Sequence, residues 1–350
     1  VLVCIVMFFL FIMKYYDEIK VWILNRVIVK RGILSINCPW FRLSDYLLDD
    51  SSGVDLYNKM KQKHGDFPLT TQFNEQVYLV TNVSYIRTIL DNSPTIFGVG
   101  NIKKKFFSSF MSKNVGVSHG CPWKRRRQIN EFALDSDKLH KFSNEYNLYM
   151  KDYINRWKRK KQITHSDFTQ LGKYMTAKIV FGVDHIHEDV FHLFSEANST
   201  NVLLNKKFSI DSEIYKNYLH ILNHYIDNPK PNSLIQLCIS ASNDREEILH
   251  QIPHFIFPIL GLFISTIPRV LVLLYNHDNE FNKVIDEIYK TRDIDIYKMK
   301  YTRKCIMETL RLMNPLITTF RTLLKDFRFD DKYSFPKGPQ FLILNNPVLR

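Results

Sequence analysis

A glutamate and an arginine stand three residues apart in the helix-favouring stretch Met307-Glu308-Thr309-Leu310-Arg311. Residues at that spacing lie on one face of a helix, so Glu308 and Arg311 can form an ion pair. Pro315 predicts the end of this helix. Because Glu-x-x-Arg is common on solvated helix faces, its meaning depends on what else the chain carries.

A second pair combines an indole with a guanidinium. Trp123 and Arg127 are four residues apart in the run Trp123-Lys124-Arg125-Arg126-Arg127, so they share a helix face. Two donors aimed the same way can hold a buried carboxylate or phosphate. Four consecutive basic residues also occur in nucleic-acid-binding patches and on ordinary solvated helices. The run by itself leaves these three interpretations open.

A hydroxyl pair, Ser265-Thr266, lies within the strongly apolar segment 244–277. A core helix and a membrane segment are the simplest interpretations, but three prolines and an arginine argue against a straight span. Gly261, the two hydroxyls and Pro268 predict a local opening of the backbone hydrogen bonds. Openings of that kind can face a ligand.

Motifs of metal sites and of the common enzyme classes are weak in this sequence or absent from it. His185 and His187 with nearby carboxylates resemble a zinc site, but no partner of fitting spacing follows, so a solvated loop is favoured. The chain contains no Gly-rich phosphate loop, no Gly-x-Ser-x-Gly elbow and no His-Glu-x-x-His. The common hydrolase, kinase and dehydrogenase signatures are therefore excluded.

The elements that must position these residues are mostly helical. The chain has 350 residues, of which 45% are hydrophobic and only 11 are glycine, which disfavours a doubly wound fold. Apolar spacing predicts a long helix over 136–161 and a helix after Ser166 as a cap. A hairpin is expected near 67–81, followed by a helix that Asn82 caps, and the end of the chain is β-like. We expect a mainly α fold with a small β portion near each end.

The first 13 residues are apolar and uncharged, and basic residues follow them. That run spans about 20 Å as a helix, short of the roughly 30 Å hydrocarbon core, so it is a signal core or an anchor that begins earlier. No small-residue cleavage site follows, and the positive-inside rule places the basic side in the cytosol. We expect residues 1–34 to be a membrane anchor and basic linker, and 35–350 the body. The net charge of +13 suits an anionic membrane surface, and the five scattered cysteines suit a reducing compartment.

Together these features resemble the cytochrome P450 family over roughly residues 35–350. The anchor, Trp123-x-x-x-Arg127, Ser265-Thr266 and Glu308-x-x-Arg311, followed by Arg321 and a Phe-Pro-Lys-Gly turn, arrive in the family's order. The details are most similar to the sterol-hydroxylase and prostacyclin-synthase branch.

The resemblance assigns roles to the matching residues. It implies a haem (heme) cofactor, with Trp123, Arg127 and Arg321 donating to the haem propionates. Ser265 and Thr266 would supply the proton-delivery hydroxyls over the iron. Glu308 and Arg311 would form a buried structural ion pair.

Two departures from the family's pattern stand out. Ile264 occupies the position where the family usually has an acidic residue before its threonine, which weakens a proton relay. The axial cysteine thiolate belongs to a loop well after Glu-x-x-Arg. None of the five cysteines has that context, so no metal ligand is identified and the P450-like fold is expected to be C-terminally incomplete.

The resemblance implies a membrane-anchored haem-thiolate monooxygenase that oxidises a lipophilic substrate such as a sterol or fatty acid. An NADPH-dependent reductase would be its electron donor, with no nucleic acid as partner. The expected location is a membrane of the endoplasmic-reticulum type, with a single-pass anchor and a cytosolic body. The alternatives are a catalytically inactive remnant without a haem ligand and a basic helical protein that binds membrane or nucleic acid.

Overall fold

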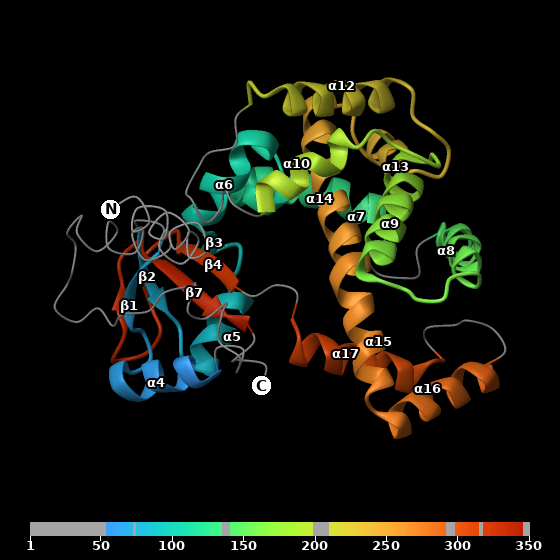
Figure 1. Cartoon of the computed structure of the whole chain (residues 1–350). Helices are drawn as coiled ribbons and strands as arrows, with labels where there is room; N and C mark the ends of the chain where they lie inside the picture. Colours follow the sequence, from blue (N-terminus) through green and yellow to red (C-terminus); the bar gives the residue numbers. More distant parts are fainter. Residues whose placement is uncertain are drawn as a thin grey trace, which may run out of the picture.

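The computed structural model describes residues 54–72, 75–134, 141–198, 210–291, 298–314 and 318–345. The expected anchor and linker, residues 1–34, lie outside these ranges, as does Pro315. A large helical lobe and a smaller lobe built on a β-sheet make up the described chain (Figure 1). The predicted mainly α fold with a small β portion is confirmed.

The helices form the bulk of the molecule and are numbered along the chain. They are α4 (Val54–His64), α5 (Val83–Asp91), α6 (Asn101–Met111), η1 (Val115–Val117), α7 (Gly120–Leu134), α8 (Ser143–Trp157), α9 (His165–Thr176), η2 (Ala177–Phe181), α10 (Asp189–Asn198), α12 (Glu213–Asp227), α13 (Leu234–Ala241), α14 (Arg245–Gly261), η3 (Leu262–Thr266), α15 (Ile267–Tyr275), α16 (Asp278–Thr291) and α17 (Lys300–Leu312).

The main sheet joins the two ends of the described chain. Its strands are β1 (Leu69–Gln72), β2 (Glu75–Leu79), β3 (Phe97–Val99), β4 (Thr318–Leu323) and β7 (Gln340–Leu344), in the order β1-β2-β7-β4-β3. The predicted hairpin is β1 and β2, and β2 then pairs in parallel with β7. A second, two-stranded sheet pairs β5 (Phe327–Arg328) with β6 (Ser334–Phe335). The sheet lobe therefore forms only when segments about 260 residues apart meet.

Aromatic side chains fill the core of the sheet lobe. Phe67 makes ring contacts with Tyr85, Phe329 and Tyr333 at centroid distances of 4.9–5.1 Å. Phe341 of β7 is fully buried against the same group. Such large rings give a lobe with few residues enough apolar area to pack.

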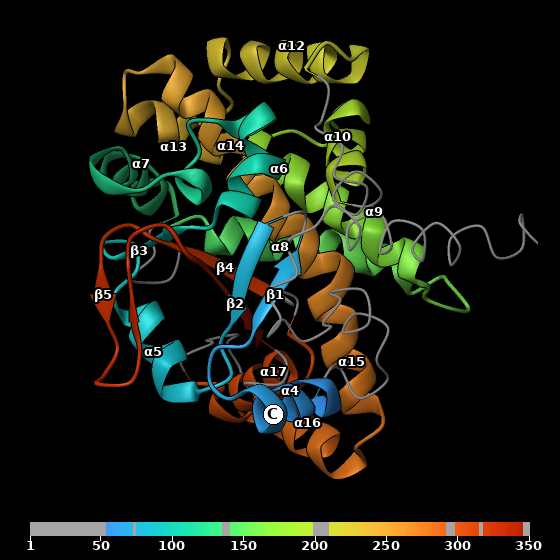
Figure 2. The same cartoon turned by 90° about the vertical axis from the view of Figure 1, so that its left-hand side faces the viewer.

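A long interrupted helix runs through the helical lobe from the α12 and α13 end to the α16 and α17 end (Figures 1 and 2). It consists of α14, η3 and α15, and η3 is a π-helical turn. Pro268 lacks the N–H that would bond to the carbonyl of Ile264, and its ring crowds that carbonyl, so the turn before it widens. The predicted opening of this segment is confirmed. By length and mean hydropathy the helix could cross a membrane, with 22% of its most apolar window buried inside the protein.

The helix caps agree with the sequence prediction at α5 and differ from it at α9. Asn82 caps α5, as predicted, by accepting a hydrogen bond from the backbone N–H of Ser84 at 2.9 Å. The predicted cap at Ser166 is wrong, because Thr164 caps α9 in a capping box with Asp167. The predicted helix over 136–161 is shorter, since α8 covers Ser143–Trp157 and residues 135–140 lie outside the described chain.

Candidate functional site

The Glu308–Arg311 pair forms within α17, as the spacing predicts. Arg311 donates from Nε and Nη2 to the two carboxylate oxygens of Glu308, at 2.7 and 2.6 Å. These hydrogen bonds hold the pKa of the Glu308 carboxyl below its usual value. The side chains of Arg311 and Glu308 are 39% and 53% exposed, so here the pair lies on a surface and not in the expected buried setting.

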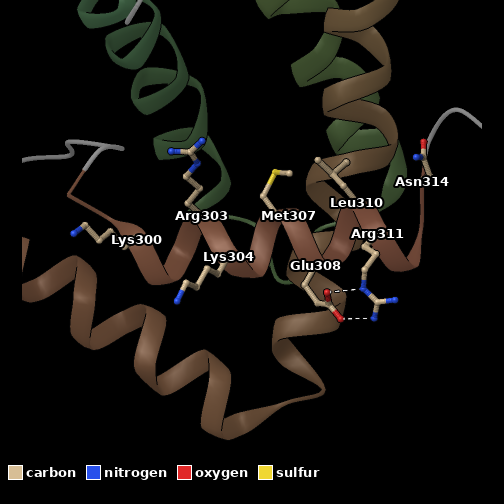
Figure 3. A pocket seen from close by; sticks show the side chains of 8 residues that line it. All are labelled: Lys300, Arg303, Lys304, Met307, Glu308, Leu310, Arg311 and Asn314. Carbon is tan, nitrogen blue, oxygen red and sulfur yellow. Dashed lines mark hydrogen bonds and ion pairs between the residues drawn. The ribbon is translucent and has the colours of Figure 1, made fainter. Parts of the chain in front are cut away.

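The pair lies in a hollow of about 1010 Å³ along α17 (Figure 3). The hollow is basic at one end and apolar in the middle. Its lining residues are Lys300, Arg303, Lys304, Met307, Glu308, Leu310, Arg311 and Asn314. Only Thr309 of α17 is buried, and the other residues of this helix are half-buried or exposed.

The basic run on α7 is divided between two faces. Arg125 and Arg126 turn toward α14, where both donate to Glu247, at 2.5 and 2.7 Å. Glu247 is 2% exposed and Arg126 12%. Burial would raise the pKa of the Glu247 carboxyl, but the two arginines outweigh burial and hold that pKa below its usual value. Neither a uniformly solvated face nor a continuous basic patch describes this run.

The other face of α7 carries the predicted Trp123 and Arg127. Trp123 is half-buried, and Arg127 donates from Nε to Glu131 at 2.7 Å, a pair that is nearly half exposed at both ends. Arg127 also lies close enough to His254 of α14 to lower the pKa of that imidazole. Of the two predicted clamp residues, the structure therefore places Arg127 near the central helix, as it does Arg125 and Arg126.

Arg321 stands on β4, in register with Val99 of β3. Its guanidinium donates to Ser93 Oγ at 3.2 Å and to the backbone oxygen of Phe320 at 3.0 Å. Burial lowers the pKa of this guanidinium, which no carboxylate of the described chain neutralises. A largely buried arginine without an acidic partner has donors left for an anion.

Lys103 and His254 join Arg321 and were not singled out by the sequence. Burial lowers the pKa of Lys103, and the charge of Arg321 lowers it further. Burial, helped by Lys103 and Arg127, lowers the pKa of His254 to about 4. Lys103 is nevertheless exposed to solvent, so its lowered pKa reflects the protein atoms packed around its ammonium group. The spacing of His250 and His254 on an apolar helix was the signal that could have found the histidine.

These four residues form what we call the cationic cluster: Lys103 of α6, Arg127 of α7, His254 of α14 and Arg321 of β4. They come from four elements and are linked by the electrostatic effects just described. Among the described residues, Glu131 is the one carboxylate paired with any member of the cluster. An arrangement of this kind can bind an anion such as a carboxylate.

The hydroxyl pair occupies the π-helical turn η3. Ser265 donates from Oγ to the backbone oxygen of Gly261 at 2.7 Å, and Thr266 is 6% exposed. The turn packs on α9, where a Cβ on Gly172 would come within 3.2 Å of the Phe263 Cβ. Eleven residues of helix, about 16 Å, separate Ser265 from His254. The structure therefore brings Arg127 and Arg321 together with His254 and Lys103, and places the hydroxyls farther along the central helix.

The haem implied by the motifs can be tested against these residues. Its propionate carboxylates match the cationic cluster, whose Arg321 and Lys103 lack an acidic partner in the described chain. The described cysteines do not match its thiolate ligand. Burial raises the pKa of Cys238 to about 12, and burial followed by Glu280 and Glu287 raises that of Cys305. Cys121 is exposed at the start of α7, and Cys4 and Cys38 lie outside the described residues.

Comparisons with known proteins agree with the motifs. The family model described as cytochrome P450 matches residues 193–350. Among solved structures, the fold is similar to the retinoic acid-bound cyanobacterial CYP120A1, with a TM-score of 0.70 and 18% identity over 89% of this chain and 75% of that one. No curated protein sequence matches. The family match to residues 193–350 and the shared fold of the whole support a cytochrome P450 family member, as the order of the motifs predicts.

Proposed function

We propose that this chain is the haem-binding body of a membrane-anchored monooxygenase that oxidises a lipophilic substrate. The family and fold imply a haem cofactor and support haem monooxygenase chemistry in general. The observation that carries the proposal for this chain is the cationic cluster, because donors from four elements lie together and two of them, Lys103 and Arg321, have no acidic partner in the described chain. We assign residues 35–350 to the haem-binding body and 1–34 to the anchor.

Each site residue has a defined task in the proposal. When bound, haem supplies the one-electron and dioxygen chemistry that side chains lack. Trp123, Arg127 and Arg321 orient its carboxylates. The Glu308–Arg311 pair fixes α17 as a structural support. Ser265 and Thr266 hold protons on the central helix, although the Ser265 hydroxyl must leave the oxygen of Gly261 before it donates elsewhere.

A lipophilic acid is the substrate class that we favour over a sterol. The similar cyanobacterial structure contains retinoic acid, which is a lipophilic carboxylic acid. The cationic cluster offers this chain a way to recognise such a head group, whereas a sterol hydroxyl needs no cation. A fatty acid fits the same requirement.

The family generally implies a redox partner, for which we propose an NADPH-dependent reductase. Since Arg125 and Arg126 are held by Glu247, the basic surface left for docking consists of Lys104, Lys105 and Lys124. Binding should weaken as salt is raised, because exposed charges are screened.

The test is haem binding by the full chain. Titration with haemin should show saturable binding that Arg321→Met weakens by about tenfold or more, as expected for loss of a charge-assisted hydrogen bond. Lys158→Met, an exposed charge elsewhere, is the control. The reduced, CO-bound spectrum then reports the ligand, since a Soret band at the thiolate position requires a cysteine on the iron.

The inactive remnant is the second candidate, favoured by the raised thiol pKa values of Cys238 and Cys305. It predicts no saturable haem binding. A chain that binds haemin with an unchanged affinity in Arg321→Met would contradict our assignment of the propionate contacts.

A further inference from the structure

Three elements meet at Gly116, the central residue of η1. A Cβ added there would lie 3.5 Å from Lys103 Nζ and 3.8 Å from His254 Nδ1. The two nitrogens therefore approach the same point from α6 and α14. The same Cβ would lie 2.9 Å from Asn114 Oδ1, closer than real Cβ contacts allow. Glycine is therefore required at this position, and the two nitrogens lie beside its α-carbon without an intervening side chain of residue 116.

The loop that contains Gly116 is fixed to the central helix. Asn114 accepts a hydrogen bond from the Gly116 N–H at 2.7 Å and donates to the backbone oxygen of His250 at 2.7 Å. The Val115 N–H donates to the side chain of Gln251 at 3.0 Å. Because these bonds fall one turn before His254 on the same helix, the distance between the loop and the imidazole is set by the fold.

The charges at this point select for a carboxylate. Lys103 is a cation close to Arg321. Among the described residues, no carboxylate pairs with either side chain. A neutral imidazole can donate one N–H, and the neighbouring cations Lys103 and Arg127 oppose its protonation. A lone cation would hold any anion, but an ammonium and an imidazole nitrogen that lie 3.5 and 3.8 Å from one point match the two oxygens of a carboxylate.

We propose that Lys103 and His254 together bind a carboxylate at Gly116. Two sources have this chemistry, a haem propionate and the acid head group of a lipophilic substrate. The haem source rests on the proposed function, whereas the substrate source does not need haem to be present. In either case these two residues add to the contacts assigned to Trp123, Arg127 and Arg321.

The experiment compares acids with their esters on the full chain. Haemin is compared with haemin dimethyl ester by absorption titration, and palmitic acid with methyl palmitate by equilibrium dialysis. Lys103→Met and His254→Leu should each weaken binding of the recognised acid by about tenfold and leave its ester unchanged. Lys104→Met is the matched control, because Lys104 is the next residue on α6 and contacts His119 instead, at 3.0 Å.

The haemin and palmitic acid titrations distinguish the two sources of the carboxylate. A loss for haemin alone identifies a propionate, and a loss for palmitic acid alone identifies a substrate head group. His254→Asn keeps an N–H donor and should recover most of the affinity that His254→Leu loses. Equal losses for acid and ester, equal losses in Lys104→Met, or no loss for either acid overturns the inference. If the unaltered chain binds no haemin, the proposed function fails and the palmitic acid arm alone decides the inference.

Discussion

Two carboxylate–guanidinium pairs in this protein have almost the same geometry and opposite surroundings. Arg126 and Glu247 join α7 to α14 at 2.7 Å, with side chains 12% and 2% exposed. Arg311 and Glu308 meet within α17 at 2.6 Å, with side chains 39% and 53% exposed. The exposed pair is the one that sequence reasoning found, and the buried pair is the one it missed. The distance between the charged atoms therefore does not determine how much an ion pair contributes to the free energy of unfolding.

The strongest test of this comparison is removal of the buried carboxylate. Glu247→Ala should lower the free energy of unfolding by about 3–5 kcal/mol, because it leaves Arg126 buried without its anion. Urea denaturation measures the loss. Glu246→Ala is the matched control, since Glu246 is 59% exposed and pairs with Lys113, and it should cost less than about 1 kcal/mol. An equal loss of unfolding free energy in the two variants would show that burial does not distinguish the two ion pairs.

The two arginines that share Glu247 sharpen the comparison. Arg126→Ala should cost about 2–3 kcal/mol in urea denaturation, because the remaining carboxylate is nearly fully buried. Arg125→Ala should cost less than about 1 kcal/mol, because the Arg125 side chain is 62% exposed. A reversed order would show that burial does not set the contribution of each arginine.

The pH dependence of stability separates His254 from Glu247. The folded pKa of His254 is about 4, below its ordinary value of 6.5, because the imidazole is buried and faces Lys103 of α6 and Arg127 of α7. Between those values the unfolded chain binds the extra proton, so stability should fall by about 1.4 kcal/mol per pH unit on acidification. His254→Leu should remove the contribution of His254 and so reduce this slope in pH-dependent urea unfolding.

Glu247 should contribute to stability in a different pH range. Its pKa is lowered in the folded state, so its contribution is present above 4.5 and is lost as the pH falls below that value. The slope that remains in His254→Leu above pH 4.5 should be smaller and should come from His250 and His119, whose pKa values are also lowered, and the loss due to Glu247 should begin near pH 4.5. Persistence of the full slope from pH 6.5 would contradict the assignment to His254.

The smallest effect is expected at the pair that the sequence made most visible. Glu308→Gln should destabilise the protein least of these variants, and the loss should shrink as salt is raised, because both side chains are exposed. Urea denaturation at low and high salt measures both. A salt-independent loss as large as that of Glu247→Ala would contradict the exposed setting of this pair.

Sequence patterns predicted what depends on near neighbours in the chain. Asn82 caps its helix, and Gly261 with Pro268 marks the π-helical turn, because capping and proline effects act within one or two turns. The motifs Trp123-x-x-x-Arg127, Glu308-x-x-Arg311 and Ser265-Thr266 are also local in the sequence, which is why they could be identified as candidates. Their roles toward haem stay predictions.

What the sequence could not predict depends on contacts between distant segments. The partner of Arg126 is 121 residues away, and no local pattern links the two. In the sequence, Lys103 is the first of three consecutive lysines and His254 is one polar residue in an apolar segment, and neither pattern links the two. Only the fold brings them together at Gly116.

The parallel pairing of β2 with β7 also has a consequence for synthesis on the ribosome. Val77 pairs with Gln340, so the central part of the sheet cannot close until nearly all of the first 345 residues have been made. Contacts at such sequence separation form slowly, because a long loop must close first. Until β7 is made, the hairpin of β1 and β2 has an unpaired edge on β2, although the helical segments between β2 and β7 in the sequence have already been synthesised. Chaperone dependence during translation should therefore track exposure of this edge.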